Sequence, residues 1–182
     1  MSAKTITVHV KMDPKTLRAF SLFDTFRLKK QWKRPVLFGA ILIAFALVCF
    51  LTGKAQSAMI GSLLLIIGLG LPFVYVSMFL SQVKEQAKKM RLKPPRRVYS
   101  LAFTPEKITV TNDMKKEETV TLEWDKLAGA FRVKKAVYLY ATRTRAFILP
   151  NGQADAPDGE LWALIAGSLP QGRAFDWRGR AR

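Results

Sequence analysis

Few side chains in this sequence have the chemistry for catalysis or metal binding. The chain holds one histidine, His9, and one cysteine, Cys49, whereas a catalytic triad or a zinc site needs several such residues together. His9 alternates with apolar residues in "ITVHVKM", a pattern that places it on the solvent-facing side of a β-strand. Cys49 lies in a long apolar run and has no second cysteine for an internal disulfide. These residues predict neither a catalytic centre nor a metal site.

Two carboxylates near the middle of the chain are the best candidates for acid–base chemistry. Glu123 and Asp125 flank Trp124, so in a continuous strand they point together, away from the tryptophan. A carboxylate pair of this kind can transfer protons. The commoner structure for such a pair is a solvated strand end, with an ion pair to Lys126 or Arg132. We therefore expect no enzyme activity from this pair.

Two further patterns resemble ligand-binding motifs but lack part of the motif. The "GK" at 53–54 has neither the upstream glycine nor the following Ser or Thr of a phosphate-binding loop. Tyr138 and Tyr140 follow two lysines, which is weakly similar to a platform for single-stranded RNA. Residues 98–170 carry nine basic and nine acidic side chains, and phosphate binding needs a net positive surface. The sequence predicts no cofactor and no nucleic-acid partner.

Two long apolar runs dominate the first half of the chain. Residues 35–53 and 55–83 contain no charged side chain, and only Lys54 separates them. A helix that crosses a bilayer needs about 20 apolar residues. The first run shows no polar face and starts after 34 residues, too late for a cleavable signal sequence. We predict two transmembrane helices, at 35–53 and 56–80.

Positive charge gathers at the two outer ends of this apolar tract. Nine of the 30 Lys and Arg residues lie in 1–34 and seven lie in 84–97, against one acidic residue in the second segment. Lys and Arg near span ends hold a loop on the cytoplasmic side. Both termini are therefore predicted to be cytoplasmic, and "TGKAQS" at 52–57 is the turn on the far side. The predicted membrane-surface cluster consists of Arg27, Lys29, Lys30, Lys33, Arg34, Lys84, Lys88, Lys89, Arg91 and Lys93.

The spans themselves carry few clues to function. They hold no Asp, Glu, His, Lys or Arg, the residues that normally mark ion or proton paths. Pro72 predicts an ordinary kink in the second span. Small residues could let the two helices pack closely, and the sequence is also compatible with an oligomer. The pairs considered for this contact are Ser57 with Gly61, and Ala40 with Ala44.

The flanking segments have clear secondary-structure patterns. Residues 1–34 contain a strand at 4–12 and then one amphipathic helix, with Asp13 as N-cap and Pro14 at the first helical position. Residues 84–97 are predicted to continue the second span as a basic helix that ends in a hinge at "PP". Residues 98–170 hold six short β-rich runs and a final helix capped by Asp158. Residues 171–182 are expected to be a loose basic tail.

We therefore expect an α+β membrane protein. It combines a two-helix transmembrane hairpin with a small antiparallel sheet closed by a C-terminal helix, which is similar to a pleckstrin-homology-like module. Pattern alone leaves other small β-folds open, and the N-terminal strand is available to join the sheet. Val137 and Leu139 alternate with Tyr138 and Tyr140, which predicts a strand with one wet face.

This order of parts resembles the YcxB-like family of small bacterial membrane proteins. The resemblance covers almost the whole chain and rests on "FTPEKITVTN", "LEWDKLAGAFRVKKAVYLY" and "AFILPNGQ". The Trp124–Asp125 pair and the triplet 148–150 are its most specific pieces. The family implies a protein of the bacterial inner membrane with a cytoplasmic β-domain at 98–170, and it implies no catalytic residue.

Two functions follow from these features. The first is a non-catalytic binding or regulatory module, held at the membrane, whose partner is a protein or a lipid headgroup. The basic cluster would then contact anionic lipid, each Lys or Arg contributing about 1 kcal/mol. The second is a small subunit of a transporter or channel, which would need polar lining from other subunits because two apolar helices offer no path.

Overall fold

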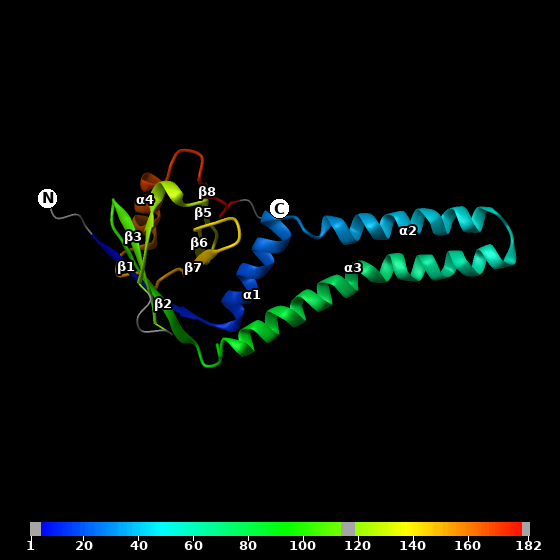
Figure 1. Cartoon of the computed structure of the whole chain (residues 1–182), viewed down its shortest axis with the longest axis horizontal. Coiled ribbons are helices and arrows are strands. Elements are labelled where there is room, and N and C mark those ends of the chain that lie inside the picture. The colour runs from blue at the N-terminus through cyan, green and yellow to red at the C-terminus, as the bar shows by residue number, and fades with distance from the viewer. Residues whose placement is uncertain (1–4, 114–118, 180–182) are drawn as a thin grey trace. The chain divides into compact units, whose positions relative to one another are not determined.

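The computed structural model describes residues 5–113 and 119–179, which divide into two compact units (Figure 1). The β-unit comprises residues up to Thr16 and from Leu92 onward. The helical unit comprises Leu17–Arg91. The chain therefore leaves the β-unit after its first strand, builds the helical unit and returns to the β-unit. The observed class is α+β, with two long apolar helices and two small sheets.

The first sheet is an antiparallel meander in the order β1-β2-β3-β4. Its core face is apolar because buried residues alternate along β1, where Ile6, Val8 and Val10 are buried. The N-terminal strand joins this sheet, and Met12 at its end lies opposite Arg96 at the start of β2. The strands are β1 (Ile6–Met12), β2 (Arg96–Phe103), β3 (Lys107–Asn112) and β4 (Thr119–Glu123).

The second sheet has the order β7-β6-β5-β8. Its first three strands are antiparallel, whereas β8 runs parallel to β5. Every residue of β6 is buried, so the wet face predicted from Tyr138 and Tyr140 is wrong. This burial also removes the tyrosine platform considered for RNA. The strands are β5 (Gly129–Arg132), β6 (Ala136–Tyr140), β7 (Ala146–Pro150) and β8 (Ala174–Asp176).

Hydrogen bonds join the two sheets into one unit. The Tyr99 hydroxyl on β2 accepts from the backbone N–H of Ile148 at 2.7 Å and donates to the Ile148 carbonyl at 3.1 Å. On the other edge of β1, the N–H of His9 donates to the carbonyl of Gln153 at 3.2 Å. The N–H of Asp155 donates to the Thr7 carbonyl at 2.9 Å. The N-terminal strand is thus held along both of its edges.

The last helix, α4 (Asp158–Ser168), buries Leu161 and Ile165. Asp158 was predicted to cap this helix, and that prediction is wrong. Pro157 precedes the first turn without a side-chain cap, and the Asp158 carboxylate instead accepts the N–H of Gly152 at 2.8 Å. The Asp158 side chain therefore stabilises the turn that precedes α4.

Residues predicted to extend β4 form a short 3₁₀ turn, Trp124–Lys126, because the Trp124 side chain turns into the core. Its indole N–H donates to the Thr104 carbonyl at 3.0 Å. The strand ends at Glu123, so Glu123 and Asp125 do not lie on one continuous strand. Glu123 pairs with Lys126 at 2.8 Å, one of the two ion pairs expected for it. The carboxylates form a solvated strand end rather than an acid–base pair.

The helix predicted after the first strand is broken into parts. α1 (Pro14–Leu22) begins as expected, since the Asp13 carboxylate accepts the N–H of Thr16 at 2.6 Å. Hydrogen bonding to Thr16 also lowers the pKa of Asp13. The chain then widens into a π-helix, Phe23–Leu28, which ends where the N–H of Lys29 donates to the Asp24 carbonyl at 2.9 Å. The single helix predicted to run through residue 34 is therefore wrong.

Candidate membrane-surface site

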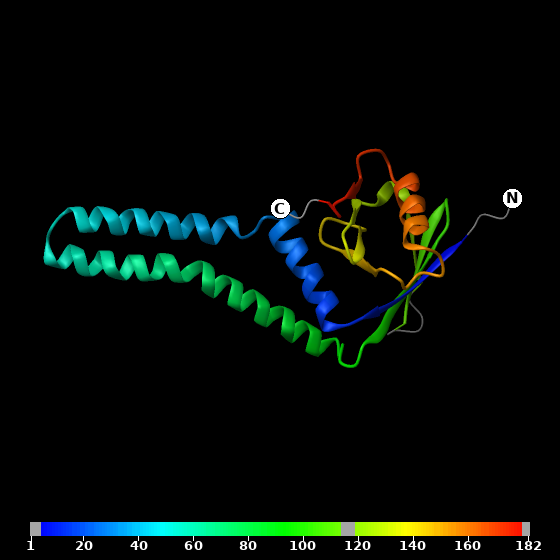
Figure 2. The ribbon, with the colours of Figure 1, turned by 180° about the vertical axis from the view of Figure 1, so that it is seen from behind.

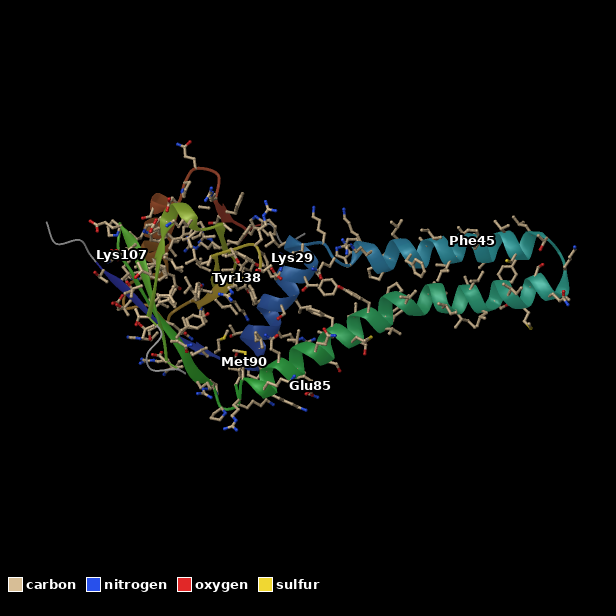
Figure 3. All side chains as sticks on the ribbon, in the orientation of Figure 1. Lys29, Phe45, Glu85, Met90, Lys107 and Tyr138 are labelled. Carbon is tan, nitrogen blue, oxygen red and sulfur yellow. The ribbon has the colours of Figure 1, made fainter. Side chains whose placement is uncertain are left out.

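Two helices of the helical unit are long and apolar enough to cross a membrane. α2 (Lys33–Leu51) and α3 (Ala55–Lys89) each have a window of mean hydropathy 2.4. Only 11% and 6% of the residues in those windows are buried, which argues against core helices of a globular unit. The helices run side by side as a hairpin in both views (Figures 1 and 2), and side chains such as Phe45 stand out from the ribbon (Figure 3).

Glycines set the closest approach of the two helices. A Cβ atom built on Gly39 would lie 2.6 Å from the carbonyl oxygen of Gly68, and one on Gly61 would lie 3.0 Å from the carbonyl of Ala46. These four small residues are buried between the helices. Gly61 was among the residues predicted for this contact, whereas Ala40 and Ala44 are exposed. The alternative with Gly61 is therefore the one observed, and Ala40 and Ala44 do not form the contact between the helices.

The same contacts fix the register of the hairpin. Gly39 faces Gly68 and Ala46 faces Gly61. Moving toward the C-terminus along α2 by some number of residues therefore corresponds to moving toward the N-terminus along α3 by the same number. The start of α2 at Lys33 then lies level with Val74. The rest of α3 continues beyond that level for about 22 Å, at about 1.5 Å per residue. α3 contains Pro72 near this level and changes direction part-way along its length (Figure 1).

The extension of α3 beyond Val74 packs against the π-helix. The Phe26 ring meets the rings of Tyr75 and Phe79 edge-on, with centroids 6.4 Å and 5.2 Å away. The predicted continuation of the second span as a basic helix is observed as far as Lys89, where α3 ends. Apolar residues of α3 beyond Pro72, such as Tyr75 and Phe79, therefore pack against the π-helix.

All ten residues of the predicted basic cluster are exposed. They form two groups rather than one ring. The first group lies at the start of α2 and in the segment before it. The second group begins on α3 at Lys84, about 15 Å along the helix beyond the level of Lys33. The first group is Arg27, Lys29, Lys30, Lys33 and Arg34, and the second is Lys84, Lys88, Lys89, Arg91 and Lys93.

Neighbouring carboxylates neutralise part of this charge. Lys29 pairs with Asp24 at 2.6 Å, and Lys88 pairs with Glu85 at 3.2 Å. The first pair lies in the first group and the second pair in the second group, so each group keeps an excess of positive charge. Lys30 and Arg91 have a φ of 50°, a left-handed conformation that ends a helix and that glycine usually supplies. At both places the chain has a cation where a neutral glycine would fit better.

Among the described residues, His9 and Asp113 both contact the Ser100 hydroxyl, whereas Cys49 lies in the helical unit. His9 is exposed on β1, as predicted, with its Nδ1 3.2 Å from the Ser100 hydroxyl. Cys49 lies on α2 in the helical unit. Within residues 5–113 and 119–179, no group of three or more His, Cys, Asp or Glu residues could hold a metal ion.

Comparison of the chain with protein-family models, with curated proteins and with solved structures finds no significant match.

Sequence reasoning missed two features of these units. The tail predicted to be loose contains β8, which is a strand of the second sheet. The hydroxyl of Tyr99, which ties β2 to β7, was also missed. The aromatic residues of "AFDW" at 174–177 were the only signal for the first feature, and no local signal marks the second.

Proposed function

We propose that this chain is an integral membrane protein that displays a non-catalytic binding or regulatory module on one side of the bilayer. α2 and α3 cross the membrane as a hairpin, and the β-unit lies on the cytoplasmic side of a bacterial inner membrane. Its partner is a protein or an anionic lipid surface. Within the described residues, the Ser100 hydroxyl donates to Asp113 rather than to His9, and Cys49 lies in the helical unit, so these groups do not form a nucleophile–base pair.

The pairing of β1 with β2 is the observation that carries this proposal. β1 precedes the hairpin in the sequence and β2 follows it, yet seven residues of β1 pair with β2. A sheet cannot form across a bilayer, so both ends of the hairpin must lie on the same side. Two crossings satisfy this condition. The excess of Lys and Arg at those ends supports the cytoplasmic side.

The arrangement of strands supports a pleckstrin-homology-like module. Four antiparallel strands form one sheet, three more form the second, and α4 follows them in the chain. In this proposal β8 is an addition to the module, and the membrane hairpin is an insertion between its first two strands. The same order of parts supports the resemblance to the YcxB-like family.

The two basic groups support contact with anionic lipid. Cations near a negatively charged leaflet contribute about 1 kcal/mol each. Because the groups lie at different levels along α3, the first group would contact headgroups directly. The second group would lie further from the hydrocarbon, beyond the Debye length of about 8 Å at physiological ionic strength, so it would contribute less. The runner-up function, a subunit of a transporter or channel, gains no support from α2 and α3, because the contacts at their glycines are with backbone carbonyls and uncharged side chains.

Excision of the module tests this proposal. Met12 and Arg96 are paired, so a two-residue Asn-Gly turn can replace residues 13–95 and make β1 and β2 an ordinary hairpin. We expect this shortened chain to be soluble without detergent and to unfold cooperatively, because it keeps the strands of both sheets and loses only Leu92 from the buried residues of the β-unit. Circular dichroism and analytical ultracentrifugation would measure both properties.

A matched fragment that starts at residue 92 lacks β1 and should aggregate, because it leaves the edge of β2 and the core beneath β1 uncovered. Equal solubility of both fragments would contradict an inserted hairpin. Vesicles that hold the full chain should also retain a potassium gradient as well as empty vesicles do. A leak that rises with the amount of protein would favour the channel subunit.

A further inference from the structure

The C-terminal segment binds the β-unit as an extended peptide would. β8 lies parallel to β5, with Ala174, Phe175 and Asp176 opposite Ala130, Phe131 and Arg132. The N–H of Ala130 donates to the Arg173 carbonyl at 2.8 Å, and the N–H of Trp177 donates to the Arg132 carbonyl at 2.8 Å. The segment thus extends the second sheet at its β5 edge. Addition of a strand to a sheet edge is a general mode of peptide recognition.

The β5 edge is shaped for the backbone of this segment. Gly129 has a φ of +149°, which disfavours any side chain. A Cβ atom built there would lie 2.8 Å from the Arg173 carbonyl oxygen. The Arg173 guanidinium donates to the carbonyls of Asp125 and Leu127, both at 2.7 Å. These two hydrogen bonds favour an arginine at position 173, the first residue of the segment.

Aromatic rings supply the side-chain part of the contact. The Phe131 ring stacks on Phe175 with centroids 5.0 Å apart and an interplanar angle of 13°. Trp177 meets the same ring edge-on at 5.5 Å, and Tyr140 does so from β6 at 5.5 Å. Phe131 therefore contacts both Phe175 and Trp177, which lie two residues apart and so point to the same side of an extended segment.

The segment is short and held at the surface. β8 has three residues, of which Phe175 and Asp176 are exposed. It follows a turn in which the Arg173 N–H donates to the Pro170 carbonyl at 3.2 Å and Gly172 has a φ of +80°. A three-residue strand beyond such a turn can detach without loss of the core beneath α4.

We propose that the β5 edge is a peptide-binding site that the chain's own residues 173–177 occupy, and that its partner is an extended protein segment with the pattern Arg-x-Phe-x-Trp. This inference rests on the proposed function and names the site and the partner class of its module. The tail acts as a competing ligand tethered to the site. Tethering gives it a local concentration of roughly millimolar, so the partner must bind tightly or arrive at high local density.

Competition with a free peptide tests the site. The probe is a fluorescein-labelled peptide of residues 171–179, QGRAFDWRG, titrated into the full chain in detergent micelles. The double variant F175A/W177A weakens the tethered tail, so we expect it to bind the probe at least about tenfold more tightly than the wild-type chain does. Fluorescence anisotropy measures both affinities.

Two controls separate recognition from non-specific adhesion. A probe with alanine in place of its Phe and Trp should lose binding, because it lacks the rings that contact Phe131. F131A added to the double variant should weaken the unaltered probe by about tenfold or more. Equal binding to the wild-type chain and the double variant, or no effect of F131A, would overturn the proposal and leave β8 as a cover for the sheet edge.

Hydrogen exchange of the wild-type chain gives a test that needs no variant. The Trp177 N–H should exchange at least about 100-fold faster than the amides of β6, because a displaceable tail opens without global unfolding. Equal rates would mean that the tail opens only with the whole unit, which contradicts the proposal. Both assays are done in detergent. Their failure would therefore refute the peptide site alone, whereas failure of the excised module refutes the inserted hairpin.

Discussion

Valine in place of Gly39 is expected to force α2 and α3 apart and to destabilise the hairpin by about 1–3 kcal/mol. Even the first side-chain atom would lie 2.6 Å from the Gly68 carbonyl oxygen, which is backbone and cannot rotate away. The helices must therefore shift as rigid rods, and the contact between Ala46 and Gly61 is lost with them. Unfolding of the full chain by SDS in mixed micelles, followed by circular dichroism, measures the change.

Gly70→Val is the matched control for this change. Gly70 also lies in an apolar helix of the hairpin, and a Cβ atom there meets no heavy atom within 4 Å. The two variants share the cost of a β-branched residue in a helix, so their difference isolates the clash. If both lowered the stability equally, the helix contact described at Gly39 would be wrong.

Phenylalanine in place of Tyr99 is expected to destabilise the β-unit by about 1–3 kcal/mol. The change removes one hydroxyl and leaves the N–H and the carbonyl of Ile148 without that partner at a buried edge of β7. The ring contact with Phe147, at 5.5 Å, is preserved. Thermal unfolding of the full chain in detergent, followed by near-ultraviolet circular dichroism, measures the loss.

The effect of Tyr99→Phe should not depend on pH between about 5 and 9. Burial raises the pKa of the Tyr99 hydroxyl above its ordinary value of 10.0, so the group stays neutral over this range in both the folded and the unfolded chain. The neutral Tyr99 hydroxyl contributes its full stabilisation at any pH below the pKa of tyrosine in the unfolded chain. That stabilisation is lost only at higher pH. Tyr75→Phe, which changes a tyrosine of the helical unit, should leave the β-unit unaffected. A similar loss in that control would show that the two hydrogen bonds to Ile148 are not the cause.

Local signals predicted the elements whose residues determine their own conformation. Asp13 and Pro14 start α1 as expected, because a capping carboxylate and a fixed φ act within a few residues. The β-rich runs of 98–150 all contain strands for a similar reason, since their apolar residues alternate. The sequence left open whether the N-terminal strand joins the sheet, and β1 does pair with β2.

Features set by distant partners could not be predicted in this way. β8 has only three residues, and its hydrogen bonds are to β5, far away in the sequence. Tyr138 alternates with apolar residues like a surface tyrosine, yet it is buried because both faces of β6 are covered. The hairpin register depends on which small residues meet, and a sequence rich in Gly and Ala offers several choices. Each of these outcomes is a property of tertiary packing rather than of a local pattern.

The most direct test of the account is the position of Lys54 relative to the C-terminal end. Cys49→Ser provides a chain without native thiols, into which Lys54→Cys or Gly179→Cys is introduced. Intact bacterial spheroplasts that express either variant are then treated with a membrane-impermeant maleimide. A hairpin that crosses the inner membrane twice predicts that Lys54→Cys is labelled in intact spheroplasts and that Gly179→Cys is labelled only after lysis. Labelling of Gly179→Cys from outside, or recovery of the chain in the soluble fraction, would contradict a membrane hairpin with a cytoplasmic β-unit.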